Sequence, residues 1–72
     1  MPVRDLEVEV YRSNRRAAGP FDLVADPDNT QALREYLQDW LAGGKWDQGH
    51  WPKFSLKVRY AGSWRVQKVV RI

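Results

Sequence analysis

The sequence predicts an α+β fold in which two strands, one helix and two further strands follow one another along the chain (ββαββ). Apolar and polar residues alternate near both ends of the chain, and one middle segment has apolar residues at helical spacing. Clusters of glycine, proline and asparagine separate these segments. We expect a single domain, residues 1–72, with one mainly antiparallel sheet and the helix packed on one of its faces. The main alternative is a β-grasp arrangement, in which the first and last strands pair in parallel.

The first strand is predicted over residues 3–12, because one face of this segment is apolar and the other is mostly acidic. The apolar face holds Leu6, Val8 and Val10, and the other face holds Asp5, Glu7, Glu9 and Tyr11. Residues 13–20 read as a polar, basic loop closed by Gly19 and Pro20. A short second strand over residues 21–25 is expected to pair back on the first. The alternative makes residues 21–25 an irregular linker and the fold βαββ.

A helix is predicted from the segment 26–29 to about Ala42. Either Asp26 or Asp28 can serve as its N-cap, where an acid also suits the helix dipole. The apolar stripe at three-and-four spacing comprises Leu33, Tyr36, Leu37, Trp40 and Leu41. Gly43 and Gly44 are expected to end the helix in the left-handed conformation. An aromatic loop, residues 45–52, then leads to the last strands.

The last twenty residues are predicted to form a hairpin. A two-residue turn at Gly62 and Ser63 has favourable turn chemistry, but its register would mix apolar and charged residues on one face. A three-residue loop keeps the faces separate, so we expect Tyr60 opposite Trp64. The residues expected to face the helix are Leu6, Val8, Val10, Phe21, Leu23, Phe54, Leu56, Val58, Trp64, Val66 and Val70. Lys68 is in phase with them, which predicts an edge position, a bulge near Gln67 or a snorkelling side chain.

Charge is unevenly distributed along the chain. The net charge is +3, but residues 51–72 carry six basic side chains and no acid, whereas residues 17–50 carry a net charge of −4. The expected register sets Arg59 opposite Arg65 and Lys53 opposite Arg71. Because like charges across a ladder are destabilising, an acidic neighbouring strand or an anionic partner should offset them.

This charge pattern predicts a small, non-enzymatic binding protein that contacts nucleic acid. Basic side chains, including Arg12 in the first loop, would neutralise phosphates, and tryptophans would stack on bases. The residues expected to contact nucleic acid are Lys57, Arg59, Arg65, Arg71, Arg15, Arg16, Trp46 and Trp51. The alternative is a protein-interaction module that uses the aromatic loop and the outer sheet face, including Tyr11, Val24 and Val69. A homo-oligomer is compatible with both.

No motif in the sequence indicates a reaction. His50 is the single histidine, and no second histidine, cysteine or activated serine completes a site with it and Asp47. Glu7 and Glu9 are about 7 Å apart along a strand, a spacing that suits a carboxylate pair, but a solvated strand face explains them better. We therefore expect no catalytic residue, no cofactor and no metal site. The absence of cysteine, of a membrane-length apolar run and of a signal-like N-terminus leads us to expect a soluble, cytoplasmic protein that does not enter membranes.

The segment from Val8 to Arg16, a strand that runs into a basic turn, resembles the openings of small uncharacterised accessory proteins encoded by actinobacterial phages. The resemblance covers about the first sixteen residues. It implies a location in the host cytoplasm and a host or phage component as partner. It assigns no role to any residue.

Overall fold

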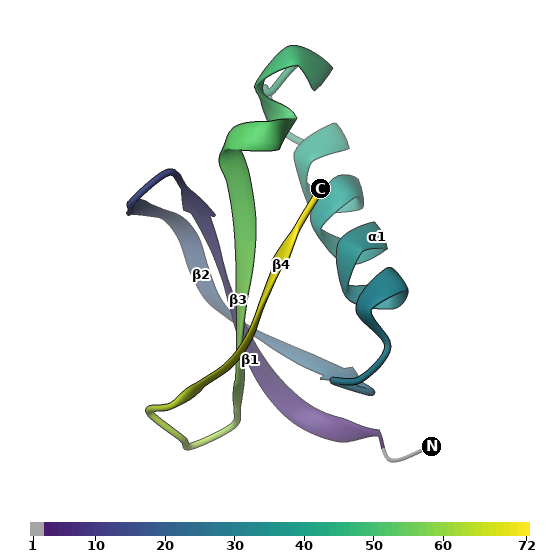
Figure 1. Ribbon diagram of the computed structural model, residues 1–72, viewed down its shortest axis with the longest axis vertical. Coiled ribbons are helices and arrows are strands. Elements are labelled where there is room, and N and C mark those ends of the chain that lie inside the picture. Colours follow the sequence, from purple (N-terminus) through teal and green to yellow (C-terminus); the bar gives the residue numbers. More distant parts are fainter. Residues whose placement is uncertain (1–2) are drawn as a thin grey trace.

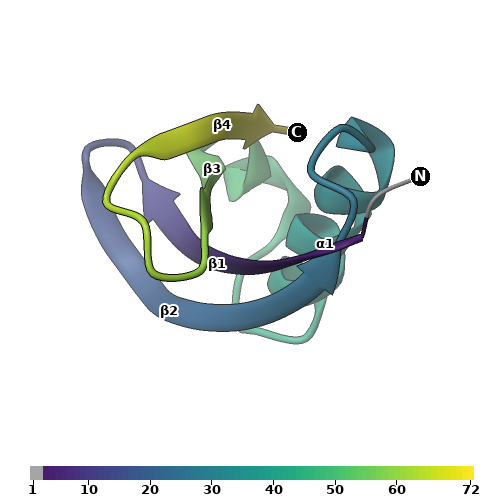
Figure 2. The ribbon, with the colours of Figure 1, turned by 90° about the horizontal axis from the view of Figure 1, so that it is seen from below.

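A four-stranded antiparallel sheet carries one helix across one face, as the computed structural model of residues 3–72 shows (Figure 1). The elements are β1 (Arg4–Arg12), β2 (Arg15–Ala25), α1 (Thr30–Ala42), the short 3₁₀ helix η1 (Gln48–Lys53), β3 (Phe54–Tyr60) and β4 (Val66–Arg71). The strands lie in the order β2-β1-β3-β4, with β2 and β4 along opposite edges (Figure 2). The predicted α+β class and ββαββ order are confirmed. The β-grasp alternative is wrong, because β1 pairs antiparallel with β3 and β4 lies at an edge.

Strand β2 is longer than the sequence suggested. The expected loop over residues 13–20 is wrong for most of its length, since only Ser13 and Asn14 form the turn and β2 begins at Arg15. The β1–β2 register shifts twice, and the first shift, between Val8 and Val10, accommodates Gly19, whose φ is 105°. A Cβ atom there would lie 2.9 Å from the carbonyl oxygen of Val8, so only glycine fits. The pairing of residues 21–25 with the first strand is confirmed.

The N-cap of helix α1 lies one residue after Asp28 and three residues after Asp26, the two predicted caps. Oδ1 of Asn29 accepts a hydrogen bond from the backbone N–H of Ala32 at 3.1 Å, so Asn29 is the N-cap. Oδ1 of Asp26 instead accepts from the backbone N–H of Asp28 at 2.9 Å, which makes a local turn ahead of the helix. The prediction of Asp26 or Asp28 as the N-cap is therefore wrong.

The C-terminal end of α1 also differs from the expectation. Gly43 has φ −79° and ψ −7°, which is right-handed, and its N–H donates to the carbonyl of Asp39 at 3.0 Å. The predicted left-handed cap is wrong, because this residue continues the helical path for one more bond. The predicted apolar stripe is confirmed: Leu33, Leu37 and Leu41 are fully buried, and Tyr36 and Trp40 are partly buried against them.

The β3–β4 hairpin has a different register from the predicted one. Leu56 lies opposite Val70 and Val58 opposite Lys68, and the register then shifts so that Arg59 lies opposite Val66. Gln67 is the extra residue at this shift, which confirms the predicted bulge. The bulge and a longer connection, residues 61–65, move the start of β4 away from the core.

Two residues predicted for the core lie outside it because of this register. Trp64 is 97% exposed and Val66 is 36% exposed. Lys68 points toward the helix side, where its Nζ donates to Oγ1 of Thr30 at 2.6 Å and to the carbonyl of Pro27 at 3.3 Å. The polar group of Lys68 thus reaches the start of α1 while its stem lies along the apolar face.

The core is the layer between α1 and one face of the sheet. Its fully buried members are Leu6, Val8, Val10, Leu33, Leu37, Leu41, Phe54, Leu56, Val58 and Val70. Phe21 and Leu23 pack against this cluster and are partly buried. The opposite face of the sheet, which we call the outer face, is not covered by α1 (Figure 2). No helix within residues 3–72 is long and apolar enough to cross a membrane.

Candidate nucleic-acid interface

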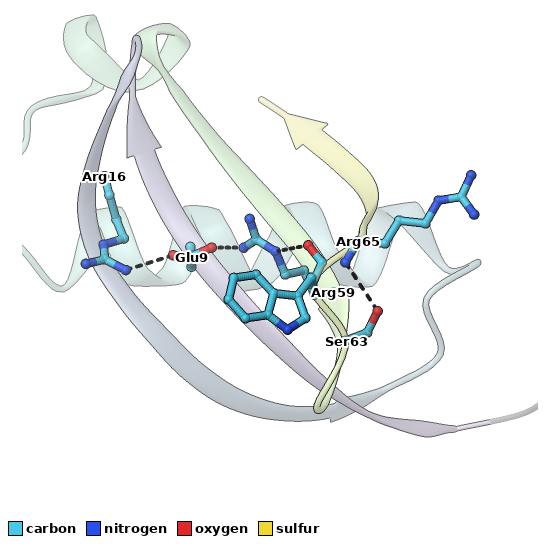
Figure 3. Close-up of polar contacts among 6 residues, drawn as sticks. Glu9, Arg16, Arg59, Ser63 and Arg65 are labelled. Atoms are coloured by element: carbon cyan, nitrogen blue, oxygen red, sulfur yellow. Dashed lines mark hydrogen bonds and ion pairs between the residues drawn. The ribbon is translucent and has the colours of Figure 1, made fainter.

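The carboxylate of Glu9 lies between two of the arginines that the sequence marked for phosphate binding (Figure 3). Its Oε2 is 3.1 Å from Nη1 of Arg16 on β2, and its Oε1 pairs with Nη1 of Arg59 on β3. Glu9 is only 6% exposed, so both ion pairs are partly shielded from water. Arg16 and Arg59 are therefore engaged within the protein.

The acidic strand β1 offsets the basic strand β3 along the outer face. The β1–β3 register sets Glu7 opposite Arg59 and Glu9 opposite Lys57. Nζ of Lys57 also lies 3.9 Å from the centroid of the Tyr11 ring, which is a cation–π contact. The sequence suggested that an acidic neighbouring strand or an anionic partner would offset the charge of the basic strands. The acidic neighbouring strand is present, and it is β1.

The like-charge pairs predicted for the hairpin do not form. Arg59 lies opposite Val66, and Arg71 lies opposite Ser55. Arg65 precedes β4 and is exposed beside the connecting loop (Figure 3). The cations of the hairpin are thus spread along it and partly compensated, so the hairpin face is not a continuous positive surface.

Trp46 and Trp51 are packed against the core. The ring of Trp46 meets Phe54 edge-on at 4.9 Å, and the guanidinium of Arg12 lies 5.1 Å from the centroid of its ring. Nε1 of Trp51 donates to the carbonyl of Trp46 at 3.3 Å. Both side chains are half-buried and contribute to the fold, which makes them weaker candidates for base stacking than the sequence suggested.

Four exposed cations gather at the end of the sheet where β1 ends and β3 begins. We call this cluster the basic end, and it comprises Arg12, Arg15, Lys53 and Arg71. They come from β1, β2, η1 and β4, whose ends meet there because the sheet is antiparallel. A hydrogen bond of 2.9 Å from the N–H of Ser13 to the carbonyl of Lys53 ties the β1–β2 turn to η1.

Two adjoining hollows lie at the basic end. One, of about 420 Å³, is lined by Arg12, Ser13, Asn14, Arg15 and Lys53. The other, of about 260 Å³, is lined by Ser13, Asn14, Pro52, Lys53, Phe54, Ser55 and Arg71. No carboxylate lines either hollow, and within residues 3–72 none of the four cations forms an ion pair. The basic end therefore combines free positive charge with hydroxyl and amide groups.

The loop between β3 and β4 presents Trp64 beside a groove on the outer face. The groove has a volume of about 400 Å³ and is lined by Glu7, Glu9, Pro20, Arg59, Gly62, Ser63 and Trp64. Nε of Arg59 donates to the carbonyl of Trp64 at 3.3 Å, and Oγ of Ser63 accepts from the N–H of Arg65 at 3.2 Å (Figure 3). The sequence reasoning missed this exposed aromatic because it assigned Trp64 to the core.

The only histidine of the chain, His50, makes a local contact in η1. Its Nδ1 lies 2.7 Å from Oδ1 of Asp47, and both side chains are exposed. The hydrogen bond to His50 lowers the pKa of the Asp47 carboxyl below its ordinary value. In the described part of the chain no group of three or more histidine, cysteine or acidic side chains is placed to hold a metal ion. The contact joins the side chain of Asp47, the residue before η1, to a side chain within η1.

Comparison with known proteins finds no relative: the chain matches no family model, no curated protein and no solved structure. The resemblance to phage accessory proteins therefore stays a prediction. The basic end and the Trp64 groove are the two features of this structure that suggest a function.

Proposed function

We propose that this protein is a non-enzymatic module that binds nucleic acid, and that the basic end is where it contacts the phosphates. The proposal is carried by one observation: four exposed cations from four elements converge there, and no carboxylate within residues 3–72 pairs with them. Free cations held close together attract a polyanion because binding releases the counterions condensed on it.

The neutral groups of the basic end suit the same ligand. Ser13, Asn14 and Ser55 line the hollows between the cations. Hydroxyl and amide donors are common partners of phosphate oxygens, and they fix the position of the backbone without reading its sequence. The site therefore favours phosphate contact with little sequence preference.

The proposal moves the phosphate site from the face of the hairpin to its end. Arg12, Arg15 and Arg71 keep the role that the sequence suggested, and Lys53 joins them. Arg16 and Arg59 are left out, because Glu9 binds both. Lys57 stays near the site but is held over Tyr11.

The test is a titration of the protein with an oligonucleotide of about eight residues, within the range that small single-stranded binders cover, at several salt concentrations. Four phosphate contacts predict a slope of log K against log salt of about −3. The double variant Arg15→Ser/Lys53→Ser should bind more weakly and reduce the slope by about half. The matched control is Arg4→Ser, since Arg4 is exposed at the other end of β1, over the Tyr60 ring. Salt-independent binding, or equal loss in Arg4→Ser, would overturn the proposal.

A second candidate function is binding of a host or phage protein through the outer face. It is favoured by exposed apolar side chains there, namely Trp64, Val24 and Val69. An interface anchored by these groups should be nearly insensitive to salt, so the same series of salt concentrations separates the two candidates. A location in the host cytoplasm is a proposal that rests on the phage resemblance alone.

A further inference from the structure

Trp64 is exposed to solvent on the loop that connects β3 to β4, and backbone hydrogen bonds hold this loop. Its side chain is 97% exposed, although a buried tryptophan would remove roughly 150 to 250 Å² from water. The N–H of Ser63 donates to the carbonyl of Tyr60 at 2.9 Å, and the N–H of Ala61 donates to that of Asp5 at 3.0 Å. These bonds hold the backbone of the loop on its β3 side, so the loop carries Trp64 on a defined backbone path.

The Glu9 ion pairs hold the same loop from the other side. Glu9 fixes the guanidinium of Arg59, and Nε of Arg59 donates to the carbonyl of Trp64 (Figure 3). The backbone position of Trp64 thus depends on a nearly buried carboxylate on the neighbouring strand β1. A loop whose backbone is held in this way loses less conformational freedom when a ligand binds to it.

The groove beside Trp64 suits a flat, partly polar group. Trp64 and Pro20 supply apolar surfaces, and Glu7 and Arg59 lie along the polar side. Its volume of about 400 Å³ falls in the range of small-ligand sites. A nucleobase has an apolar face for stacking and polar edges for hydrogen bonds, which is the combination that this groove offers.

Strand β3 runs along the outer face from the basic end to this groove. Along β3, Ser55, Lys57 and Arg59 point to the outer face, and Arg71 lies opposite Ser55. From Ser55 to Arg59 the strand advances about 13 Å, and the Trp64 groove follows directly. A few nucleotides can span this distance.

Acidic residues beside the groove limit how far the nucleic-acid backbone can extend across the outer face. Glu7 and Asp22 lie opposite each other on β1 and β2, and Asp5 lies opposite Val24 farther along. No ion pair within residues 3–72 neutralises these three carboxylates. Phosphates are repelled from this corner, so the groove should take a base whose phosphate stays on the β3 side.

We infer that Trp64 stacks on an unpaired base and that the nucleic acid bound by this protein is single-stranded. The inference rests on the proposed function and names its ligand class. In a duplex the bases are paired and stacked on each other, so an indole on a loop has no free base face to contact. The phosphates lie on the basic end, and one base occupies the groove beside Trp64.

The experiment compares wild type, Trp64→Ala and Trp64→Phe for binding to an eight-residue single strand, as DNA and as RNA, and to a duplex of the same sequence. Wild type should prefer the single strands. Trp64→Ala should bind the single strands about 5- to 150-fold more weakly than wild type, as expected for the loss of one base stack. Its affinity for the duplex should equal that of wild type. Trp64→Phe should retain part of the affinity. Val24→Ala is the control, because Val24 is an exposed apolar residue outside the groove.

The outcomes separate this inference from the proposed function. Salt-sensitive binding with equal affinity for single strand and duplex, unchanged in Trp64→Ala, overturns the role of Trp64 and leaves the proposed function standing. The absence of binding to every oligonucleotide overturns both. Because Trp64 is almost fully exposed, Trp64→Ala should fold normally, which the far-ultraviolet circular dichroism spectrum checks.

Discussion

The carboxylate of Glu9 on β1 pairs with the guanidinium of Arg59 on β3, and this contact determines how the cations of the protein are distributed. Because Arg16 binds the same carboxylate, the middle of the outer face is neutralised from inside the molecule. Four cations that form no ion pair within residues 3–72 gather at the basic end, and Nε of Arg59 donates a hydrogen bond to the carbonyl of Trp64. Glu9 therefore lies between the proposed phosphate site at the basic end and the proposed base site beside Trp64.

Replacing Glu9 should destabilise the fold. Glu9→Gln leaves Arg16 and Arg59 without their anion, and we expect the free energy of unfolding to fall by about 1 to 3 kcal/mol. Urea denaturation followed by tryptophan fluorescence measures the change. Glu7→Gln is the matched control on the same strand, since Glu7 makes no ion pair within residues 3–72, and it should change stability by less than about 0.5 kcal/mol. Equal losses in the two variants would contradict a specific role for Glu9.

Lys68 should contribute to stability although it is a lysine in an apolar row. Lys68→Met keeps most of the stem but loses the hydrogen bonds to Thr30 and Pro27, so we expect a loss of about 1 kcal/mol. Thermal or urea unfolding gives the value. The neighbouring change Gln67→Met, at the exposed bulge residue, should be nearly neutral. If both changes are neutral, the contact between β4 and α1 does not stabilise the protein.

The N-cap of α1 can be identified by comparing two neighbouring residues. Asn29→Ala removes the acceptor for the N–H of Ala32 and should cost about 1 kcal/mol of stability. Asp28→Ala removes an exposed acid that does not cap the helix, and its effect should be smaller. A larger loss of stability in Asp28→Ala would show that Asp28 is the N-cap, as the sequence suggested.

The Asp47 carboxyl should titrate at lower pH than an ordinary aspartate. The hydrogen bond from His50 favours its charged form, so the pKa of Asp47 lies below 3.8. A lowered carboxyl pKa stabilises the folded state above the unfolded-state value, and this contribution disappears as the pH falls through the folded-state pKa. NMR titration of the side-chain carboxyl in wild type and in His50→Ala measures the effect. Identical curves would show that His50 does not hold Asp47.

The sequence predicted the arrangement of the fold better than the contacts of its strands. The stripe of Leu33, Leu37 and Leu41 indicated α1, and the alternation in residues 3–12 and 54–60 indicated the strands of the core. These patterns are strong because one face of each element is buried. The position of β4 was predicted wrongly, since the bulge at Gln67 changes the phase of the pattern and places Trp64 outside the core.

The candidate site was only partly predictable for a related reason. The sequence shows that the last strands are basic and that the first is acidic, and an acidic neighbour was one of the two expected offsets. Which individual cations Glu9 binds depends on strand order and on diagonal contacts, which the residue pattern does not contain. The grouping of Arg12 and Lys53 with Arg15 and Arg71 likewise requires knowing which strand ends meet.

The most direct test of the account is a map of backbone and indole N–H signals by two-dimensional NMR while a single-stranded oligonucleotide is added at low salt. We predict that the largest shifts occur at Ser13, Asn14 and Lys53 and at the indole of Trp64, with small shifts at the partly buried Trp46 and Trp51. Shifts confined to the acidic corner around Asp5 and Asp22, or no shifts at the basic end at saturation, would contradict it.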